Sequence, residues 1–344
     1  MRLLFLVGLA GCYSPTVHPG APCGSGGACP GNLVCAADQT CQPPGGVDAG
    51  PDSSPLADAA IDGPPGIDAC TTCIAPANDL PGDAIDISAG GDFTADLTYA
   101  HDDASKPGTG QFCGNAGGLD VFYTIHVDAD EVYYIDTFGS DFDTVIRVFH
   151  GACTGGAAPN GTSCRNDANA CSSVQTQFAG TLSAGDNCVV IDGLDGTQTG
   201  RSLMVHVEAG GREGTRVASP SGTQTFSGTP FDTANDSNVE AGSCANYGSP
   251  DHGFYFTPCP GQTVNVTATT CNATTAASPW DTALYAHGPN GELDCTDDDG
   301  TACALNGGLS TISFTARNAH LYWVVVDAGS PNTSGAYELD LTFN

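Results

Sequence analysis

The chain has 344 residues, which is enough for two or three domains. Asp and Glu number 39 against 8 Lys and Arg, so the formal net charge is -31. This charge argues against binding to nucleic acid or anionic lipid, because both need clusters of Lys and Arg. The 17 cysteines exceed what a reducing cytosol would maintain, so the sequence indicates an oxidising compartment.

The first eleven residues carry one positive charge and a continuous apolar run. We interpret residues 1–11 as a secretory signal peptide, because this run is too short to span a bilayer. The sequence Leu9-Ala10-Gly11-Cys12 resembles the bacterial lipobox, which implies that Cys12 carries the lipid and becomes the mature N-terminus. In the bacterial sorting rule, only Asp after the lipidated cysteine retains a protein in the inner membrane. Tyr13 therefore implies an outer-membrane or cell-surface lipoprotein. The alternative is an ordinary signal peptide, with Cys12 in a disulfide.

Residues 12–41 contain four cysteines that recur every six residues. Because a segment of this size has almost no hydrophobic core, we expect disulfides to hold it together as a knot. Its sequence Cys-Pro-Gly-Asn-Leu-Val-Cys at 29–35 resembles small disintegrin-like and Dickkopf N-terminal modules. Zinc is the alternative, but this spacing without His makes a poor tetrahedral site. A passive spacer is the expected role.

A linker follows the cysteine-rich segment. Residues 42–69 hold six Pro, five Gly and five Asp with few apolar side chains, which predicts a semi-extended, disordered linker. At its full reach it spans on the order of 80 Å. Cys70 and Cys73 then open the folded part. A Cys-x-x-Cys pair can be a redox motif, but no helix follows it, so we expect structural disulfides.

The rest of the chain predicts two all-β domains, at 70–209 and 218–344. Short alternating runs separated by Gly, Asn and Asp are typical of a two-sheet sandwich of jelly-roll type. In the first domain we predict strands at 93–98, 121–127, 131–137, 144–150, 173–178, 188–192 and 203–208. In the second we predict them at 224–227, 254–257, 263–269, 282–287, 311–315, 321–327 and 337–343.

The two domains repeat the same landmarks in the same order. Each has an aromatic residue followed by Asp-Thr and a β-type run, at 142–150 and 280–287. Each then has Cys-x-Asx-Asp, at 164–167 and 295–298, and a Val-rich strand that ends in Asp. Upstream, the spacing from Cys to Tyr is ten residues in one copy and eleven in the other. These landmarks predict two tandem copies of one domain.

Three of these motifs resemble the bacterial pre-peptidase C-terminal (PPC) domain. They are Ser-Asp-Phe-Asp-Thr-Val at 140–145, Cys-Arg-Asn-Asp at 164–167 and Val-Val-Ile-Asp-Gly at 189–193, together with their second copies. The resemblance covers about three quarters of the chain. It implies a jelly-roll-like sandwich found beside secreted peptidases or on surface proteins, with roles in localisation and ligand binding. This chain departs from that setting because it shows no peptidase domain.

No catalytic motif is present, so we expect no enzyme, no catalytic residue and no required cofactor. The one dense acidic run is Asp294, Asp297, Asp298 and Asp299 before a glycine. Ca²⁺ prefers several carboxylate and carbonyl oxygens on a flexible loop, which makes this run a weak calcium candidate. The favoured interpretation is a solvated turn. We likewise expect Asp143 and Asp281 to cap turns.

Lipidation of Cys12 leaves sixteen cysteines for disulfides: four in the knot, two at 70 and 73, and five in each sandwich. Because five is odd, either Cys70 and Cys73 each join a sandwich cysteine, or one disulfide crosses between the sandwiches. We predict at least one equivalent disulfide in both sandwiches, with Cys164–Cys171 and Cys295–Cys303 as the favoured pairs and Cys153–Cys164 as the alternative. The disulfide candidates are Cys23, Cys29, Cys35, Cys41, Cys70, Cys73, Cys113, Cys153, Cys164, Cys171, Cys188, Cys244, Cys259, Cys271, Cys295 and Cys303.

The sequence thus predicts a non-catalytic, lipid-anchored surface protein whose tandem sandwiches serve as binding, adhesion or spacer modules. Its expected partners are the membrane, through the N-terminal lipid, and an extracellular protein or glycan. The alternative is a glycan-binding protein whose sandwiches act as carbohydrate-binding modules. Its stacking aromatics would be Trp280, Trp323, Tyr247 and Tyr285. However, strand alternation predicts a buried Trp323, and Trp280 takes the place of a core residue, Phe142.

Overall fold

The computed structural model describes residues 29, 34–35, 41–42, 74–104, 117–153, 163–211, 214–228, 242–245, 249–271, 280–298, 303, 308–330 and 334–344. The chain divides into two units, Met1–Cys70 and Thr71–Asn344. In the first unit, β1 (Val34–Cys35) pairs antiparallel with β2 (Cys41–Gln42). Most of the linker and the signal peptide lie outside the described residues.

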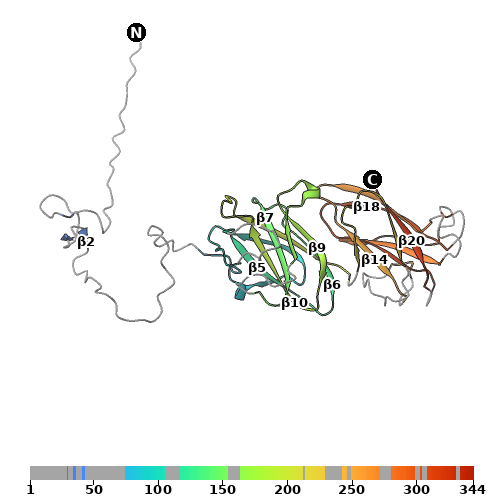
Figure 1. The fold of residues 1–344 in the computed structure, drawn as a ribbon, viewed down its shortest axis with the longest axis horizontal. Coiled ribbons are helices and arrows are strands. Elements are labelled where there is room, and N and C mark those ends of the chain that lie inside the picture. The colour runs from blue at the N-terminus through green and yellow to red at the C-terminus, as the bar shows by residue number, and fades with distance from the viewer. Residues whose placement is uncertain are drawn as a thin grey trace, which may run out of the picture. The chain divides into compact units, whose positions relative to one another are not determined.

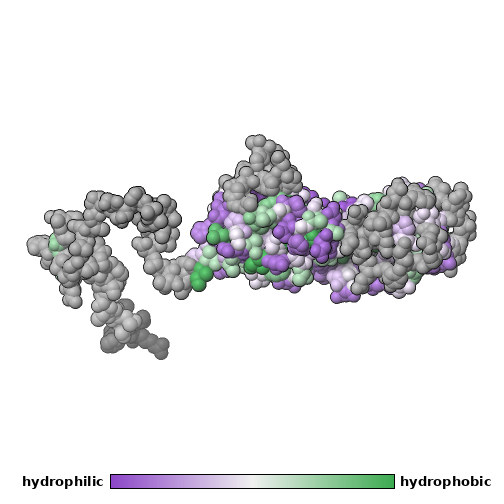
Figure 2. All heavy atoms as spheres, turned by 90° about the horizontal axis from the view of Figure 1, so that it is seen from below, coloured by the Kyte–Doolittle hydropathy of each residue, from purple (hydrophilic) through white to green (hydrophobic). Residues whose placement is uncertain are grey.

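The described part of the second unit contains strands and two single-turn 3-10 helices, η1 (Pro81–Asp83) and η2 (Asn169–Cys171), and no α-helix. The all-β prediction is therefore confirmed. None of the described helices is long and apolar enough to span a membrane. On the face drawn in Figure 2, the described surface is mainly hydrophilic, as the acidic composition predicts.

The first sandwich packs a five-stranded sheet against a four-stranded one (Figure 1). The five-stranded sheet has the order β3 (Ile85–Asp86), β5 (Asp120–Val127), β10 (Gly185–Gly193), β7 (Thr144–His150) and β8 (Ser163–Asn166). The four-stranded sheet has the order β4 (Gly91–Asp96), β11 (Ser202–Ala209), β6 (Glu131–Asp136) and β9 (Gln177–Leu182).

The second sandwich repeats this arrangement strand for strand. Its five-stranded sheet has the order β12 (Thr215–Arg216), β14 (His252–Phe256), β19 (Tyr322–Ala328), β16 (Thr282–Gly288) and β17 (Gly291–Asp297). Its four-stranded sheet has the order β13 (Gly222–Gly228), β20 (Tyr337–Phe343), β15 (Thr263–Thr269) and β18 (Thr311–Arg317). In both five-stranded sheets the first strand pairs parallel and the others pair antiparallel. The identical strand order shows that the two copies share one fold.

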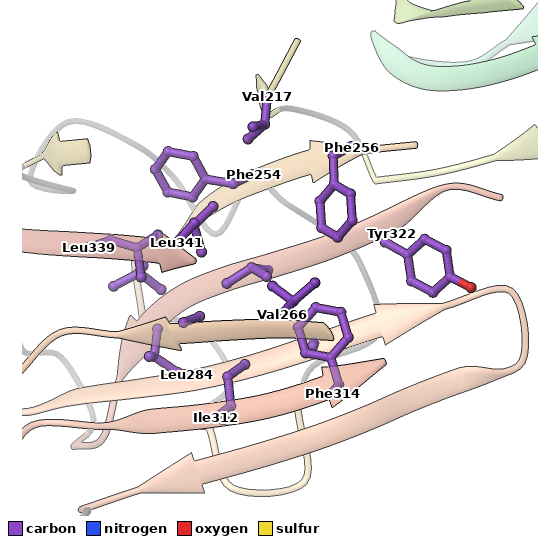
Figure 3. Packing of buried hydrophobic residues seen from close by; sticks show 14 of the residues in the cluster. Val217, Phe254, Phe256, Val266, Leu284, Ile312, Phe314, Tyr322, Leu339 and Leu341 are labelled. Carbon is purple, nitrogen blue, oxygen red and sulfur yellow. The ribbon is translucent and has the colours of Figure 1, made fainter. Parts of the chain in front are cut away.

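The core of each sandwich lies between its two sheets. Strand β20 alternates as predicted, with Tyr337, Leu339, Leu341 and Phe343 buried and the residues between them partly exposed. Figure 3 shows how Leu339 and Leu341 meet Phe254, Val266 and other residues from both sheets. Burial of these apolar side chains supplies most of the stabilisation, at about 25 cal/mol per Å² removed from water.

The strand pairing makes Phe254 the equivalent of Tyr123, whereas the sequence landmarks matched Tyr123 with Tyr255, one residue further along. In the first sandwich Tyr123 lies opposite Val189, whereas in the second Phe254 lies opposite the matching Val324. Tyr123 and Phe254 belong to the cores of their sandwiches, but Tyr255 belongs to a separate cluster. The extra residue between Cys and Tyr in the second copy therefore places its tyrosine on the opposite face of the strand.

Two local predictions were wrong. The strand predicted at 173–178 is β9, which begins at Gln177, because η2 and the Ala168–Ser173 bridge occupy the preceding residues. No strand was predicted at the Cys-x-Asx-Asp segments, and the acidic run of the second copy was interpreted as a solvated turn, yet these segments contribute to edge strands β8 and β17. Each of these strands pairs antiparallel with the Asp-Thr strand that precedes it in sequence. In the second sandwich β16 and β17 form a hairpin that turns between Gly288 and Gly291, whereas residues 151–162 separate β7 from β8.

Candidate functional site

Five of the cysteines singled out by the sequence, Cys12, Cys23, Cys70, Cys73 and Cys113, lie outside the described residues. The lipid attachment at Cys12 and the Cys-x-x-Cys pair therefore stay predictions. Cys29 and Cys35 of the knot are disulfide-bonded, as expected for a segment without a core. These disulfides, with those of the sandwiches, indicate an oxidising compartment.

The disulfides of the sandwiches correct the predicted pairings. Cys164 does not bond to Cys171, and Cys295 does not bond to Cys303; the alternative Cys153–Cys164 is also wrong. The observed disulfides are Cys153–Cys188, Cys171–Cys259, Cys244–Cys295 and Cys271–Cys303. Cys164 is bonded as well. Short separation in sequence favoured the wrong pairs, whereas tertiary packing brings distant cysteines together, as where β10 carries Cys188 past the end of β7 that Cys153 follows.

One disulfide crosses between the sandwiches. Cys171 follows β8 in the first sandwich, and Cys259 follows β14 in the second; their Cα atoms are 5.2 Å apart. This is one of the two arrangements that the odd number of cysteines in each sandwich allowed. The crossing disulfide covalently fixes one point of the junction between the two sandwiches.

Apolar side chains from both sandwiches pack together at this junction. Val132, Tyr134 and Ala179 come from the first sandwich, and Tyr255 and Trp323 come from the second. The rings of Tyr255 and Trp323 lie 5.1 Å apart. Because Phe254 faces the core, the next residue on β14, Tyr255, faces the opposite way and places its ring at the junction.

A polar cluster lies beside this apolar contact. His206 and Glu208 project from β11 of the first sandwich, and His320 precedes β19 of the second. Glu208 Oε1 contacts His206 Nε2 at 2.8 Å and also accepts a hydrogen bond from His320 Nδ1. The other oxygen, Oε2, accepts a hydrogen bond of 2.7 Å from the backbone N–H of Leu321. Glu208 therefore binds two adjacent residues of the segment that precedes β19 in the second sandwich.

The carboxylates of Asp92 and Glu208 contact the two ring nitrogens of His206 and favour its protonated form. The hydrogen bond with Glu208 raises the pKa of His206 to about 9 despite its partial burial, and Asp92 adds to this effect. Burial tends to raise the pKa of Glu208, but the hydrogen bonds from His206, Leu321 and His320 outweigh burial and lower it. At neutral pH the junction thus contains an imidazolium flanked by two carboxylates.

Of the four aspartates predicted as a weak calcium site, at 294 and 297–299, only two lie together in the described residues. Asp297 and Asp298 lie together, but their third neighbour is Asp281, before β16, with all three carboxylates within 4.8 Å of one another. Asp294 instead accepts hydrogen bonds from the backbone N–H groups of Cys295 and Ser313. Asp299 lies outside the described residues. The prediction missed Asp281, although its recurrence in Asp-Thr beside Cys-x-Asx-Asp in both copies was the available signal.

The carboxylates of this acidic cluster repel each other. Burial raises the pKa of Asp297, and the charges of Asp281 and Asp298 raise it further. The Oδ1 atoms of Asp281 and Asp297 are buried and have no hydrogen-bond partner. Gly329 allows this approach, since a Cβ there would lie 2.1 Å from Asp297 Oδ1. The acidic cluster has the oxygen ligands that Ca²⁺ accepts.

The first sandwich has the matching acid, Asp143, with Asn166 and Asp167 beside it in place of two aspartates. The backbone N–H of Leu194 donates to the carbonyl of Asp143, as that of Gly329 donates to the carbonyl of Asp281. Burial raises the pKa of Asp143, and Asp167 and Asp195 raise it further. The copies therefore share the position of the acid, but among the described residues only Asp281 has two further carboxylates that all lie within 4.8 Å of one another.

A second set of acids is buried at the ends of the central strands. Asp120 and Asp192 lie opposite each other on β5 and β10. Burial raises the pKa of Asp120 to about 7, opposed by the backbone N–H groups of Ala104 and Asp103. Burial also raises the pKa of Asp192, and Arg147, which forms a buried salt bridge with it, opposes that rise. The arrangement resembles a structural ion pair rather than a reactive carboxylate pair.

Three of the four aromatic residues expected to stack on a glycan are not exposed. Trp280, Trp323 and Tyr285 are buried, with exposed fractions of 7%, 3% and 1%. Tyr247 lies outside the described residues. The expectation that Trp280 is a core residue and that Trp323 is buried is confirmed, although Trp323 belongs to the junction cluster. Three of the four residues on which the glycan alternative depended therefore cannot stack on a sugar.

Neither a family model nor a curated protein matches this sequence. Among solved structures, the chain is similar to the pre-peptidase C-terminal domain of collagenase from Bacillus anthracis, with 14% identity over 38% of this chain and 95% of that one, and a TM-score of 0.23. It is also similar to the CUB1-EGF-CUB2 domains of rat MASP-1, with 10% identity over 75% of this chain and 99% of that one, and a TM-score of 0.19.

A further similarity is to the M60 catalytic domain with the CBM51-1 and CBM51-2 domains of Clostridium perfringens ZmpB. The identity is 10% over 66% of this chain and 34% of that one, with a TM-score of 0.18. At these scores none of the three structures bears on the function of this chain, so the function must be argued from its own residues.

Proposed function

We propose that this chain is a non-catalytic, lipid-anchored surface protein whose two sandwiches act as one cross-linked binding or spacer module. The observation that carries this proposal is the junction. Cys171–Cys259 joins the sandwiches covalently, and Glu208 holds two groups of the second sandwich. Two domains that act independently need no fixed geometry at their junction, whereas a spacer or a two-domain binding surface does.

The buried charges support a structural role rather than a catalytic one. Arg147 and Asp192 are both buried and held between β7 and β10, with exposed side-chain fractions of 3% and 2%. A general acid or base must reach a substrate, and these groups lie inside the sheet. We therefore infer that the chain has no enzymatic activity of its own.

The anchor rests on the sequence at Cys12. Two or more acyl chains hold a protein stably in a membrane, with about 0.8 kcal/mol for each buried CH₂ group. The predicted linker at 42–69 would then hold the disulfide-bonded module away from the bilayer. The outer membrane is the proposed location because Tyr13, rather than Asp, follows Cys12.

The test is metabolic labelling with a radioactive fatty acid, followed by separation of the inner and outer membranes. We expect the wild-type protein to be labelled and to fractionate with the outer membrane. Cys12→Ala should lose the label and leave the membrane fraction or stay unprocessed. Tyr13→Asp is the matched control, because it should keep the label but move the protein to the inner membrane. An unchanged membrane fraction for Cys12→Ala would overturn the anchor.

A further inference from the structure

Three side chains at the junction bring together the ligand atoms that transition metals prefer. His206 and Glu208 are two residues apart on β11, so both point to the same side of that strand. His320 reaches them from the second sandwich. The ring nitrogens and the carboxylate oxygen of these three residues all lie within 4.8 Å of one another. Two imidazoles and one carboxylate from two separate domains thus converge on one point.

A second layer of contacts orients these groups. Asp92 Oδ1 contacts His206 Nδ1 at 2.7 Å, which leaves Nε2 to face Glu208. A carboxylate on the far nitrogen of an imidazole is the usual support of a metal-binding histidine. Leu321 N–H holds Glu208 Oε2 and so leaves Oε1 at the centre of the group. The imidazole rings of His206 and His320 meet nearly at right angles, at 79°.

The group lies on the wall of a cavity of about 670 Å³ between the sandwiches. The cavity is lined by both chain segments that carry the ligand atoms and by glycine-rich backbone around Gly210 and Gly211. A metal held by three protein ligands needs space for a fourth, which in such sites is water or a bound molecule. The cavity supplies this space.

We propose that His206, Glu208 and His320 bind a divalent transition-metal ion, with zinc as the best match, and that this ion links the two sandwiches. Zinc accepts imidazole nitrogen and carboxylate oxygen in tetrahedral sites, at about 2.0–2.2 Å. Calcium prefers oxygen ligands throughout, so two imidazoles argue against it. The metal would replace the protons that now join the three side chains.

Binding requires only a small adjustment. Ligand atoms around a tetrahedral ion at about 2.0–2.1 Å stand roughly 3.3 Å apart. The separation of Glu208 Oε1 from His206 Nε2 is 2.8 Å, so these atoms must move apart by about half an ångström. Rotation of the Glu208 and His206 side chains can supply this movement, and His320, which precedes β19, can follow by rotation of its own side chain.

The test is metal binding by the full-length, oxidised protein after removal of metals with EDTA. Zinc binding is measured by titration calorimetry, and cobalt is substituted to report the ligand geometry by its visible absorption. We expect one tight site for each molecule and the intense absorption of tetrahedral cobalt. His206→Gln, Glu208→Gln and His320→Gln should each weaken zinc binding by at least about a hundredfold, and Asp92→Asn by about 10–100-fold.

His126→Gln is the matched control, because His126 also lies between two carboxylates, Asp128 and Asp186, but is confined to the first sandwich. It should leave zinc binding unchanged. His101→Gln tests a rival group, Asp79–His101–Asp103, and should also have no effect. The proposal would be overturned if zinc binding survived His206→Gln and His320→Gln. It would also be overturned if His126→Gln weakened zinc binding equally, or if only His101→Gln abolished it. So would the absence of any zinc binding by the wild-type protein.

Discussion

The two sandwiches share one strand order and differ in how each accommodates its buried charge. In the first, Asp192 on β10 forms a salt bridge with Arg147 on β7. In the second, the strand registers place Tyr285 where the first has Arg147, and Asp327 where it has Asp192. Burial and the nearby Asp251 raise the pKa of Asp327 to about 7. The shared fold therefore does not require a salt bridge at this position. The first sandwich pairs its buried aspartate with an arginine, whereas in the second the raised pKa favours the neutral form of the aspartate.

The same contrast holds at the acidic clusters. The second sandwich brings together three carboxylates, at Asp281, Asp297 and Asp298. The first has Asn166 where the second has Asp297, and Asp195 where the second has Ser330. Asp195 accepts hydrogen bonds from Thr197, so it is engaged in its own turn. The first sandwich thus carries its acid in the loop after β10, at Asp195, where the second carries it on edge strand β17, at Asp297. The carboxylates of the first site are therefore less concentrated.

The largest expected effect comes from separating the two sandwiches. The double variant Cys171→Ser with Cys259→Ser opens a covalent loop with a sequence separation of 88 residues. In the chain-entropy model this lowers the free energy of unfolding by about 4.5 kcal/mol. Calorimetry should then resolve two transitions in place of one, because each sandwich has its own core. A single transition at the wild-type temperature would show that the disulfide does not couple the two copies.

The next largest effect tests the salt bridge of the first sandwich. Arg147→Leu leaves Asp192 buried without its cation, so it should destabilise the protein by about 4 kcal/mol in urea unfolding. The double variant Arg147→Leu with Asp192→Asn should regain much of this loss, because no unpaired charge remains. Tyr285→Phe, at the matching position, should lose no more than about 1.5 kcal/mol. Equal losses at the two positions would contradict the contrast drawn between the sandwiches.

The third prediction concerns pH. The pKa of Asp327 is about 7 when folded and about 3.9 when unfolded, so the folded state binds a proton that the unfolded state has lost. Stability contributed by this group should therefore fall as the pH rises from about 4 through 7. Asp327→Asn should match the wild type near pH 4 and exceed it near pH 8, by on the order of 2 kcal/mol.

The matching substitution in the first sandwich provides the control. Asp192→Asn removes the partner of Arg147 and leaves its guanidinium buried without a counter-charge, so it should destabilise the protein near pH 8. Thermal unfolding at the two pH values measures both variants. The same sign for both substitutions near pH 8 would mean that the two aspartates occupy equivalent electrostatic environments.

The smallest effect concerns the acidic clusters. In EDTA, Asp297→Asn should raise stability by about 0.5 kcal/mol, because it removes repulsion at a partly exposed site. Asn166→Asp in the first sandwich should lower it by a similar amount. Millimolar calcium tests the weak calcium expectation directly. A rise in melting temperature that Asp281→Asn abolishes would support a site at Asp281, Asp297 and Asp298, and no rise would leave a solvated turn.

The sequence by itself determined the all-β class and the tandem repeat. Strand β20 shows why: alternation of Tyr337, Leu339, Leu341 and Phe343 with polar residues is a local pattern with a period of two, and burial of one face follows from it. The recurrence of Asp-Thr and Cys-x-Asx-Asp identified equivalent positions in the two copies. The odd number of cysteines in each sandwich also allowed the crossing disulfide.

Only the tertiary structure decided which residues meet. Cys171 bonds to Cys259 because the two sandwiches pack against each other, and Asp281 joins Asp297 because β16 pairs with β17. The junction is the clearest case. Glu208 and His320 are separated by 112 residues and belong to different domains, so no local period or spacing connects them. Contacts between domains depend on surface shape and on single residues such as Tyr255, whose face was set by one inserted residue.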